Sequence, residues 1–188
     1  MSYQPDKSEL ISASNHLFYE VKQFDATSAL LFARKSLEIN HGMMDPKDKK
    51  HRIFAIETTT NAFLESFLIH LRIILEFLFK KEAGKGKDDI ISKYYMDETD
   101  WSKMITELEK ILTGVDLDDL KKRVNTEIVH LSFERNKKDT KTKQWEYLKL
   151  RENVLKACLV FYKYANKELF SSTSKGYFEH ISREYGPV

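Results

Sequence analysis

The residues with the clearest potential for chemistry are an arginine and a histidine, Arg123 and His130, in a segment that spans residues 117–135. Seven positions separate them, which is two turns of an α-helix, so both side chains lie on the same helix face. A histidine gives or takes a proton near neutral pH, and a guanidinium stabilises negative charge on a phosphate. A site with both residues could combine proton transfer by His130 with stabilisation of negative charge by Arg123.

The helix predicted over residues 117–135 carries two neighbouring stripes of side chains. The apolar stripe consists of Leu117, Leu120, Val124, Ile128 and Leu131. The polar stripe consists of Arg123, Glu127, His130 and Glu134, with Asn125 close to its start. Glu127 is four positions after Arg123 and three before His130, a spacing that also produces ordinary ion pairs on a helix surface. A structural role for this stripe therefore stands beside the catalytic one.

A second polar stripe runs along a long apolar segment over residues 49–81. Phenylalanine, leucine and isoleucine cover most of the circumference of the helix predicted here, which is typical of a central and largely buried helix. The stripe contains Glu65, Arg72 and Glu76. Arg72 and Glu76 are four positions apart and are placed to pair, and Glu65 lies two turns before Arg72. We include these three as supporting polar residues of the candidate site.

Several short segments resemble a known superfamily of helical proteins. The run Arg123-Val124-Asn125-Thr126-Glu127-Ile128-Val129-His130 resembles the Arg-x(4–6)-His motif of the HEPN superfamily. Segments similar to those of an uncharacterised bacterial HEPN-like group are Glu65-Ser66-Phe67-Leu68-Ile69-His70-Leu71-Arg72, Asp88-Asp89-Ile90-Ile91 with the later Trp101, and His130-Leu131-Ser132-Phe133-Glu134-Arg135. The resemblance covers about residues 45–165 and includes the long apolar helix that precedes the motif.

The resemblance implies one of two functions. Active members of the superfamily cleave RNA without a metal ion, usually in a cleft formed by two protomers, whereas many other members are inactive and serve as binding or regulatory domains. Val124 follows the arginine where active members usually carry a polar residue, which favours the second group. We therefore expect a non-catalytic interaction or regulatory domain, with a protein or RNA partner and a homodimeric state. The alternative is a metal-independent endoribonuclease of a toxin–antitoxin or phage-defence system, with Arg123 and His130 as its catalytic residues.

A third hypothesis is a di-iron carboxylate site inside a helical bundle. Two Glu-x-x-His patterns occur, Glu38 to His41 and Glu127 to His130, and further carboxylates are available at Glu20, Glu65 and Glu76. His41 directly precedes Gly42, however, and a glycine at that place is typical of a helix end. Di-iron ligands lie within the bundle, so this pattern is a weak one. We expect no metal and no other cofactor.

Composition limits the class of protein. The chain of 188 residues has a net charge of +2, so it shows no overall footprint of nucleic-acid binding. Its single cysteine, Cys158, cannot form an intramolecular disulfide, which suits a reducing compartment. The first residues lack the basic and apolar regions of a signal peptide, and the most apolar stretch contains Glu65, Arg72 and Glu76. We therefore expect a cytoplasmic protein without a membrane segment.

Helical periodicity and the scarcity of turn residues predict the fold. With 6 glycines and 3 prolines, the chain has few of the residues that strand connections need. We expect an all-α fold, an antiparallel four-to-five-helix up-and-down bundle with a long central helix. Residues 1–170 would form the bundle domain, and residues 171–188 a C-terminal tail with a short amphipathic helix. A homodimer is expected because the apolar surface of the long helix, together with Val129 and Phe133, exceeds what one such bundle can bury.

Overall fold

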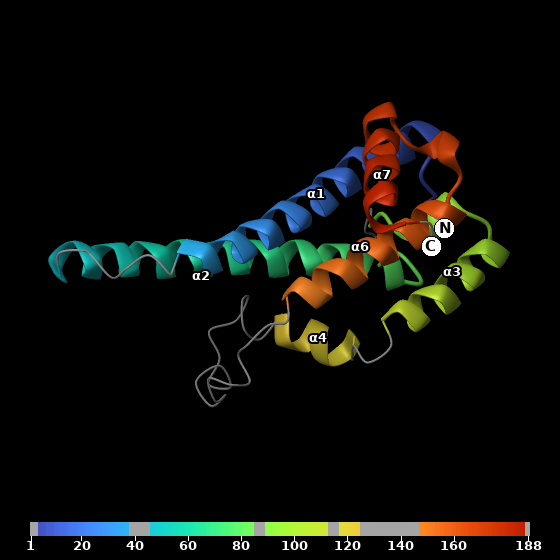
Figure 1. The fold of residues 1–188 in the computed structure, drawn as a ribbon. Coiled ribbons are helices and arrows are strands. Elements are labelled where there is room, and N and C mark those ends of the chain that lie inside the picture. Colours follow the sequence, from blue (N-terminus) through green and yellow to red (C-terminus); the bar gives the residue numbers. More distant parts are fainter. Residues whose placement is uncertain (1–3, 38–45, 85–88, 113–116, 125–146, 187–188) are drawn as a thin grey trace.

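The structure, a computed structural model, describes residues 4–37, 46–84, 89–112, 117–124 and 147–186. Every regular element within these ranges is a helix, which confirms the all-helical class predicted from the sequence. In chain order the elements are α1 (Lys7–Leu37), α2 (Pro46–Phe79), η2 (Ser92–Tyr95), α3 (Glu98–Ile111), α4 (Leu117–Val124), α6 (Tyr147–Tyr164), η5 (Lys167–Leu169) and α7 (Ser172–Tyr185) (Figure 1). Among the described helices, none combines the length and the apolar character needed to cross a bilayer.

Helix α1 is continuous from Lys7 to Leu37, although the sequence indicates a break or a bend near Asp25. Its buried hydroxyl groups bond to the backbone of the same helix. Thr27 Oγ1 donates to the Gln23 carbonyl oxygen at 2.7 Å, and Ser28 Oγ donates to the Asp25 carbonyl oxygen at 2.6 Å. Because this back-bonding satisfies the hydroxyls without taking away the backbone's own hydrogen bonds, the polar residues leave the helix unbroken.

The hydrophobic core lies where the inner part of α2 meets α1 and α6. On α2 it contains Phe67, Leu68, Leu71, Ile74, Leu75 and Leu78, all practically inaccessible to solvent. Phe24 of α1 stacks on Phe67, with 4.7 Å between the ring centroids, and Phe77 meets Phe161 of α6 edge to face at 4.9 Å. Burial of each such side chain stabilises the fold by about 1.5–3 kcal/mol. One face of the inner part of α2 is therefore deeply buried.

The last helix is joined to the first through a cluster of hydroxyl groups. The sequence indicates a flexible joint at residues 171–174, but in the structure this segment forms the start of α7. Ser171 Oγ accepts a hydrogen bond from the Ser174 backbone N–H at 3.1 Å, and Ser174 Oγ donates to the Ser14 carbonyl oxygen at 3.0 Å. Ser14 and Ser174 are fully buried, and Phe178 on α7 lies in the same core as α2. These serines therefore fix α7 against α1.

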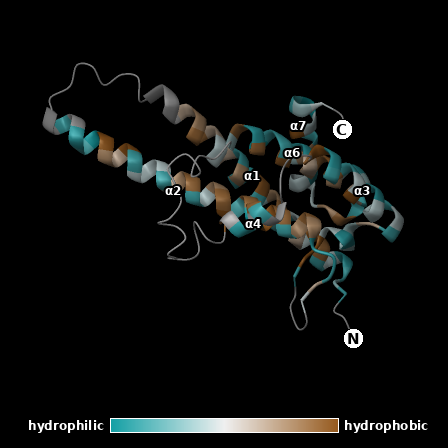
Figure 2. Ribbon diagram, turned by 90° about the horizontal axis from the view of Figure 1, so that it is seen from below, coloured by the Kyte–Doolittle hydropathy of each residue, from teal (hydrophilic) through white to brown (hydrophobic). Residues whose placement is uncertain are grey.

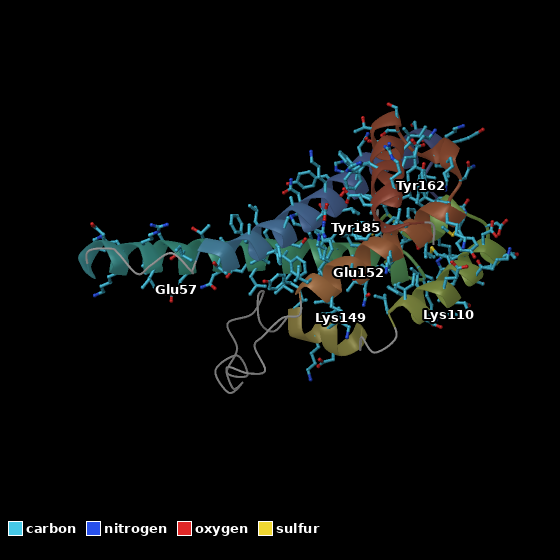
Figure 3. The ribbon with its side chains drawn as sticks, viewed as in Figure 1. Glu57, Lys110, Lys149, Glu152, Tyr162 and Tyr185 are labelled. Carbon is cyan, nitrogen blue, oxygen red and sulfur yellow. The ribbon has the colours of Figure 1, made fainter. Side chains whose placement is uncertain are left out.

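The outer part of α2, residues 46–60, lies at the described end of α1 and extends past it, and we call it the arm (Figures 1 and 2). Figure 3 shows the side chain of Glu57 on the arm, far from α3, α6 and α7. Most described side chains of the arm are exposed, including the large apolar Ile53 and Phe54. Leu30 and Phe32, near the end of α1, are also exposed. The apolar surface of the α1–α2 pair is thus buried at its inner end and open to solvent at its outer end.

Two buried tyrosines give a matched test of the described packing. The Tyr95 hydroxyl donates to the Leu10 carbonyl oxygen at 2.8 Å, whereas the buried Tyr177 hydroxyl has no partner among the described residues. Tyr95→Phe should lower the free energy of unfolding by about 1 kcal/mol, because it removes a made hydrogen bond. Tyr177→Phe should leave that free energy unchanged or raise it slightly. Urea unfolding followed by circular dichroism measures both, and equal destabilisation by the two changes would contradict this assignment.

Candidate functional site

The predicted catalytic pair falls at the edge of what the structure describes. Arg123 is the penultimate residue of α4, but its side chain lies outside the description. His130 and the supporting residues Asn125, Glu127 and Glu134 lie outside the described residues altogether. The distance between the guanidinium and the imidazole, and their pairing with Glu127, therefore stay predictions.

The described part of α4 does explain one departure from the HEPN motif. Val124 is 1% exposed and Leu120 is 6% exposed, and both belong to the hydrophobic core. A polar side chain at position 124 would have to be buried there, which costs free energy unless it finds a hydrogen-bond partner. The apolar residue directly after Arg123 thus has a packing role in this chain.

The second predicted stripe lies on the solvent side of α2. Arg72 Nε donates to Glu76 Oε1 at 2.8 Å, which confirms the pairing expected from their spacing. Glu65 and Glu76 are exposed, and so are Ile69 and Ile73 beside them. The sequence predicts a largely buried helix, but this face of α2 is open among the described residues. An exposed pair of this kind contributes little to stability, about 0.5 kcal/mol or less.

A polar pair that sequence reasoning missed lies between α1 and α2. His70 Nδ1 and Glu20 Oε2 are 2.6 Å apart, and their side chains are 13% and 19% exposed. The ring of Tyr19 meets the His70 ring edge to face, with 6.0 Å between centroids. The sequence placed His70 on the side of α2 away from the Glu65–Arg72 stripe, but it named Glu20 only as a candidate metal ligand. The missing information was which turns of the two helices face each other.

The Glu20–His70 pair has a defined chemical character. A carboxylate that bonds Nδ1 fixes the orientation of an imidazole, as it does in many enzymes and metal sites. Here both groups lie in the contact between two helices, so the pair joins α1 to α2. Within the described ranges no three His, Cys, Asp or Glu side chains come close enough together to hold a metal ion. Glu38, His41, Glu127 and His130, which the di-iron hypothesis requires, lie outside those ranges.

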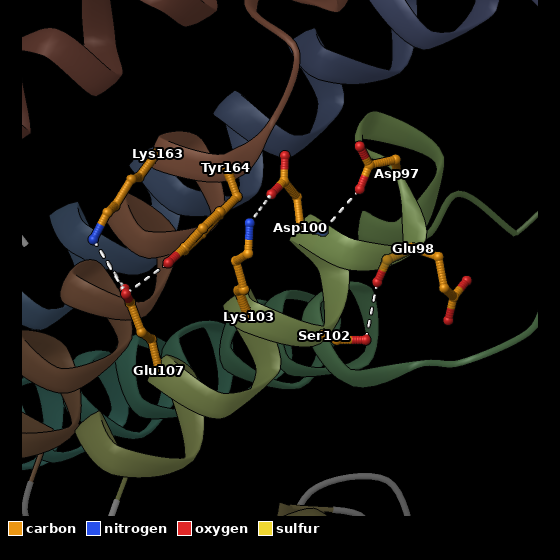
Figure 4. Close-up of polar contacts among 8 residues, drawn as sticks. All are labelled: Asp97, Glu98, Asp100, Ser102, Lys103, Glu107, Lys163 and Tyr164. Atoms are coloured by element: carbon orange, nitrogen blue, oxygen red, sulfur yellow. Dashed lines mark hydrogen bonds and ion pairs between the residues drawn. The ribbon is translucent and has the colours of Figure 1, made fainter.

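Two further polar contacts connect α6 to its neighbours. Arg151 Nη2 lies 2.7 Å from Asp25 Oδ1 on α1. On α3, Glu107 Oε1 accepts from the Tyr164 hydroxyl at 2.7 Å, and Lys163 Nζ lies 3.2 Å from the same carboxylate (Figure 4). The hydrogen bond from Tyr164, more than the charge of Lys163, holds the pKa of Glu107 below its usual value. Each contact links two helices, which is a structural task.

Two further groups whose pKa values are shifted, Cys158 and Lys167, are also explained by packing. Cys158 is 2% exposed, and burial raises the pKa of its thiol to about 12, so it is no nucleophile at neutral pH. Burial lowers the pKa of Lys167 to about 8. Its Nζ lies 3.9 Å from the centre of the Tyr162 ring, a contact that favours the charged form and offsets part of this effect.

A comparison of two double-mutant cycles tests the role of the missed pair. Glu20→Ala, His70→Ala and the double variant should give a coupling of about 1.5 kcal/mol in the free energy of unfolding, because both groups are mostly buried. The exposed Arg72–Glu76 pair, changed in the same way, should give about 0.5 kcal/mol or less. Urea titrations at neutral pH measure the free energies of unfolding from which both couplings are calculated. A coupling at Glu20–His70 no larger than at Arg72–Glu76 would show that the buried pair does not hold the helices together.

Comparison with known proteins leaves the chain without a relative to argue from. No protein-family model, no curated protein and no solved structure matches it. Its function is therefore argued from its own residues.

Proposed function

We propose that this chain is a HEPN-like helical domain with an interaction or regulatory role and no catalytic activity. In this proposal the described helices belong to an antiparallel four-to-five-helix up-and-down bundle around α2, and the domain is a homodimer in the cytoplasm. The single Cys158, buried as a thiol, is compatible with that reducing compartment. RNA or another protein would be the partner that the domain serves.

The observation that carries the proposal is the exposed apolar surface at the outer end of the α1–α2 pair. Phe54 on the arm is 70% exposed, and Phe32 on α1 is 54% exposed. Leu30 and Ile53 are exposed as well, so both helices carry large apolar side chains in solvent at this end of the pair. Exposed apolar surface of this kind favours contact with another macromolecule.

The described polar residues support the absence of catalysis. Glu20 with His70, Asp25 with Arg151, and Glu107 with Tyr164 each span two helices and are explained by that packing. Val124, next to Arg123, is buried where active HEPN members usually carry a polar residue. Among the described and the predicted features, the Arg123/His130 motif alone favours a ribonuclease.

The test is an RNA cleavage assay in EDTA, with total cellular RNA as substrate. We expect the parent protein to leave the RNA intact, and His130→Ala and Arg123→Ala to behave in the same way. A known metal-independent ribonuclease serves as the positive control, and circular dichroism checks that each variant is folded. If the parent degrades RNA and His130→Ala does not, the domain is a metal-independent ribonuclease and the non-catalytic proposal is wrong.

A further inference from the structure

The arm lacks the contacts that normally stabilise a helix. Ile56 and Thr60 are partly or fully shielded, but the other described side chains from Asp48 to Thr59 are exposed. A helix of this length, roughly 20 Å, is marginal in water by itself. Its isoleucines and threonines make it weaker still, because β-branched residues are poor helix formers. The arm continues the longer helix α2 and gains little stability from packing within the described part of the chain.

One face of the arm has a pattern that identifies this partner. Lys50, Phe54 and Glu57 are separated by four and three positions, so they form a single stripe along the helix. All three are exposed, and the apolar residue stands between a cation and an anion. Asn61, four positions after Glu57, continues the stripe as an uncharged and exposed residue. We call these residues the arm stripe.

The arm stripe is complementary to itself. When two copies of a helix pack in opposite directions around a twofold axis, each residue faces its mirror position in the partner. With the axis near Phe54, the two phenyl rings meet, and Lys50 of each copy faces Glu57 of the other. The pairing thus makes one apolar contact and two ion pairs from a single stripe. A parallel pairing would instead place Lys50 beside Lys50 and Glu57 beside Glu57.

We propose that the arm is the dimer interface of this protein, with a second copy of α2 packed antiparallel across the arm stripe. This inference rests on the proposed function and names the partner and the geometry for its exposed surface. The two exposed phenylalanines of each copy would contribute roughly 250 Å² of apolar area, about a third of what a partner in a standard interface buries. The outer turns of α1, where Phe32 is exposed, would complete a four-helix contact.

The charge pattern favours a second copy over a polyanion. A nucleic acid would meet Lys50, but it would also meet the carboxylate of Glu57 one turn beyond Phe54 on the same stripe. An isologous partner satisfies both charges at once. RNA binding by the arm would therefore overturn the inference, and sedimentation of the parent with added RNA would detect it.

The first experiment uses charge reversal and mixing. Sedimentation velocity should show that the parent dimerises with a dissociation constant in the micromolar range. Phe54→Asp should raise this dissociation constant roughly thirtyfold or more. Lys50→Glu and Glu57→Lys should each weaken self-association by roughly tenfold, because two attractions become two repulsions. The double variant Lys50→Glu/Glu57→Lys should regain the parent affinity. A mixture of the two single variants should form a heterodimer tighter than either homodimer.

A second experiment reports the geometry directly. Phe54→Cys should be crosslinked to itself by a short bismaleimide, and the buried Cys158 should not interfere because it is inaccessible in the folded protein. Ile69→Cys, exposed on the solvent face of α2, serves as the matched control and should stay uncrosslinked. Circular dichroism checks folding. The inference would be overturned by a monomeric parent, by a dimer that Phe54→Asp does not weaken, or by a mixture that forms no heterodimer. RNA binding that Phe54→Asp and Lys50→Glu abolish would overturn it as well.

The two proposals fail separately. Cleavage of RNA by a protein that dimerises through the arm would overturn the non-catalytic role and leave the interface intact. A monomer that leaves RNA uncut would overturn the interface and leave the non-catalytic role standing.

Discussion

The contact between α1 and α2 is the interaction on which the rest of the described structure depends. Phe24 stacks on Phe67, and one turn away Glu20 meets His70, so residue numbers that rise along one helix fall along the other. This register decides which residues of α2 stay available to α6. The aromatic contacts of Phe77 with Tyr95 and Phe161 form on the same helix, further inward. A shift of one residue in the α1–α2 contact would turn each side chain by about 100° and break both sets of contacts.

The same contact explains why one end of α2 is buried and the other is not. At the inner end, α6 and α7 add a further layer, and the apolar side chains that face it are inaccessible to solvent. Towards the outer end of α2 most described side chains of the arm are exposed, and Ile56 and Thr60 are the shielded exceptions. Two helices cannot enclose a core, because each leaves most of its circumference open. Burial along α2 therefore falls from its inner part to the arm.

The sequence predicted the local features of this fold well and the contacts between helices poorly. Apolar periodicity placed the long helix at residues 49–81, against Pro46–Phe79 in the structure. The prediction of helix positions succeeds because periodicity and helix ends are determined by residues close together in the sequence.

The continuity of α1 was missed, because whether Thr27 interrupts a helix depends on where its hydroxyl bonds. Glu20 with His70 and Ser14 with Ser174 were missed because they are 50 and 160 positions apart. The central motif of the candidate site, Arg123 to His130, stays a prediction of spacing alone.

The hydroxyl cluster that fastens α7 to α1 has a consequence for the order of events during synthesis. Ser14 and Ser171, and Lys7 and Glu168, are partners separated by 157 and 161 positions, so α1 leaves the ribosome long before the segment that completes its contacts. Until that segment follows, α1 and α2 keep much of their apolar surface uncovered. Closing so long a loop also slows folding, since chain entropy is lost before these contacts form. The nascent chain is thus prone to aggregation until α7 emerges and covers this surface.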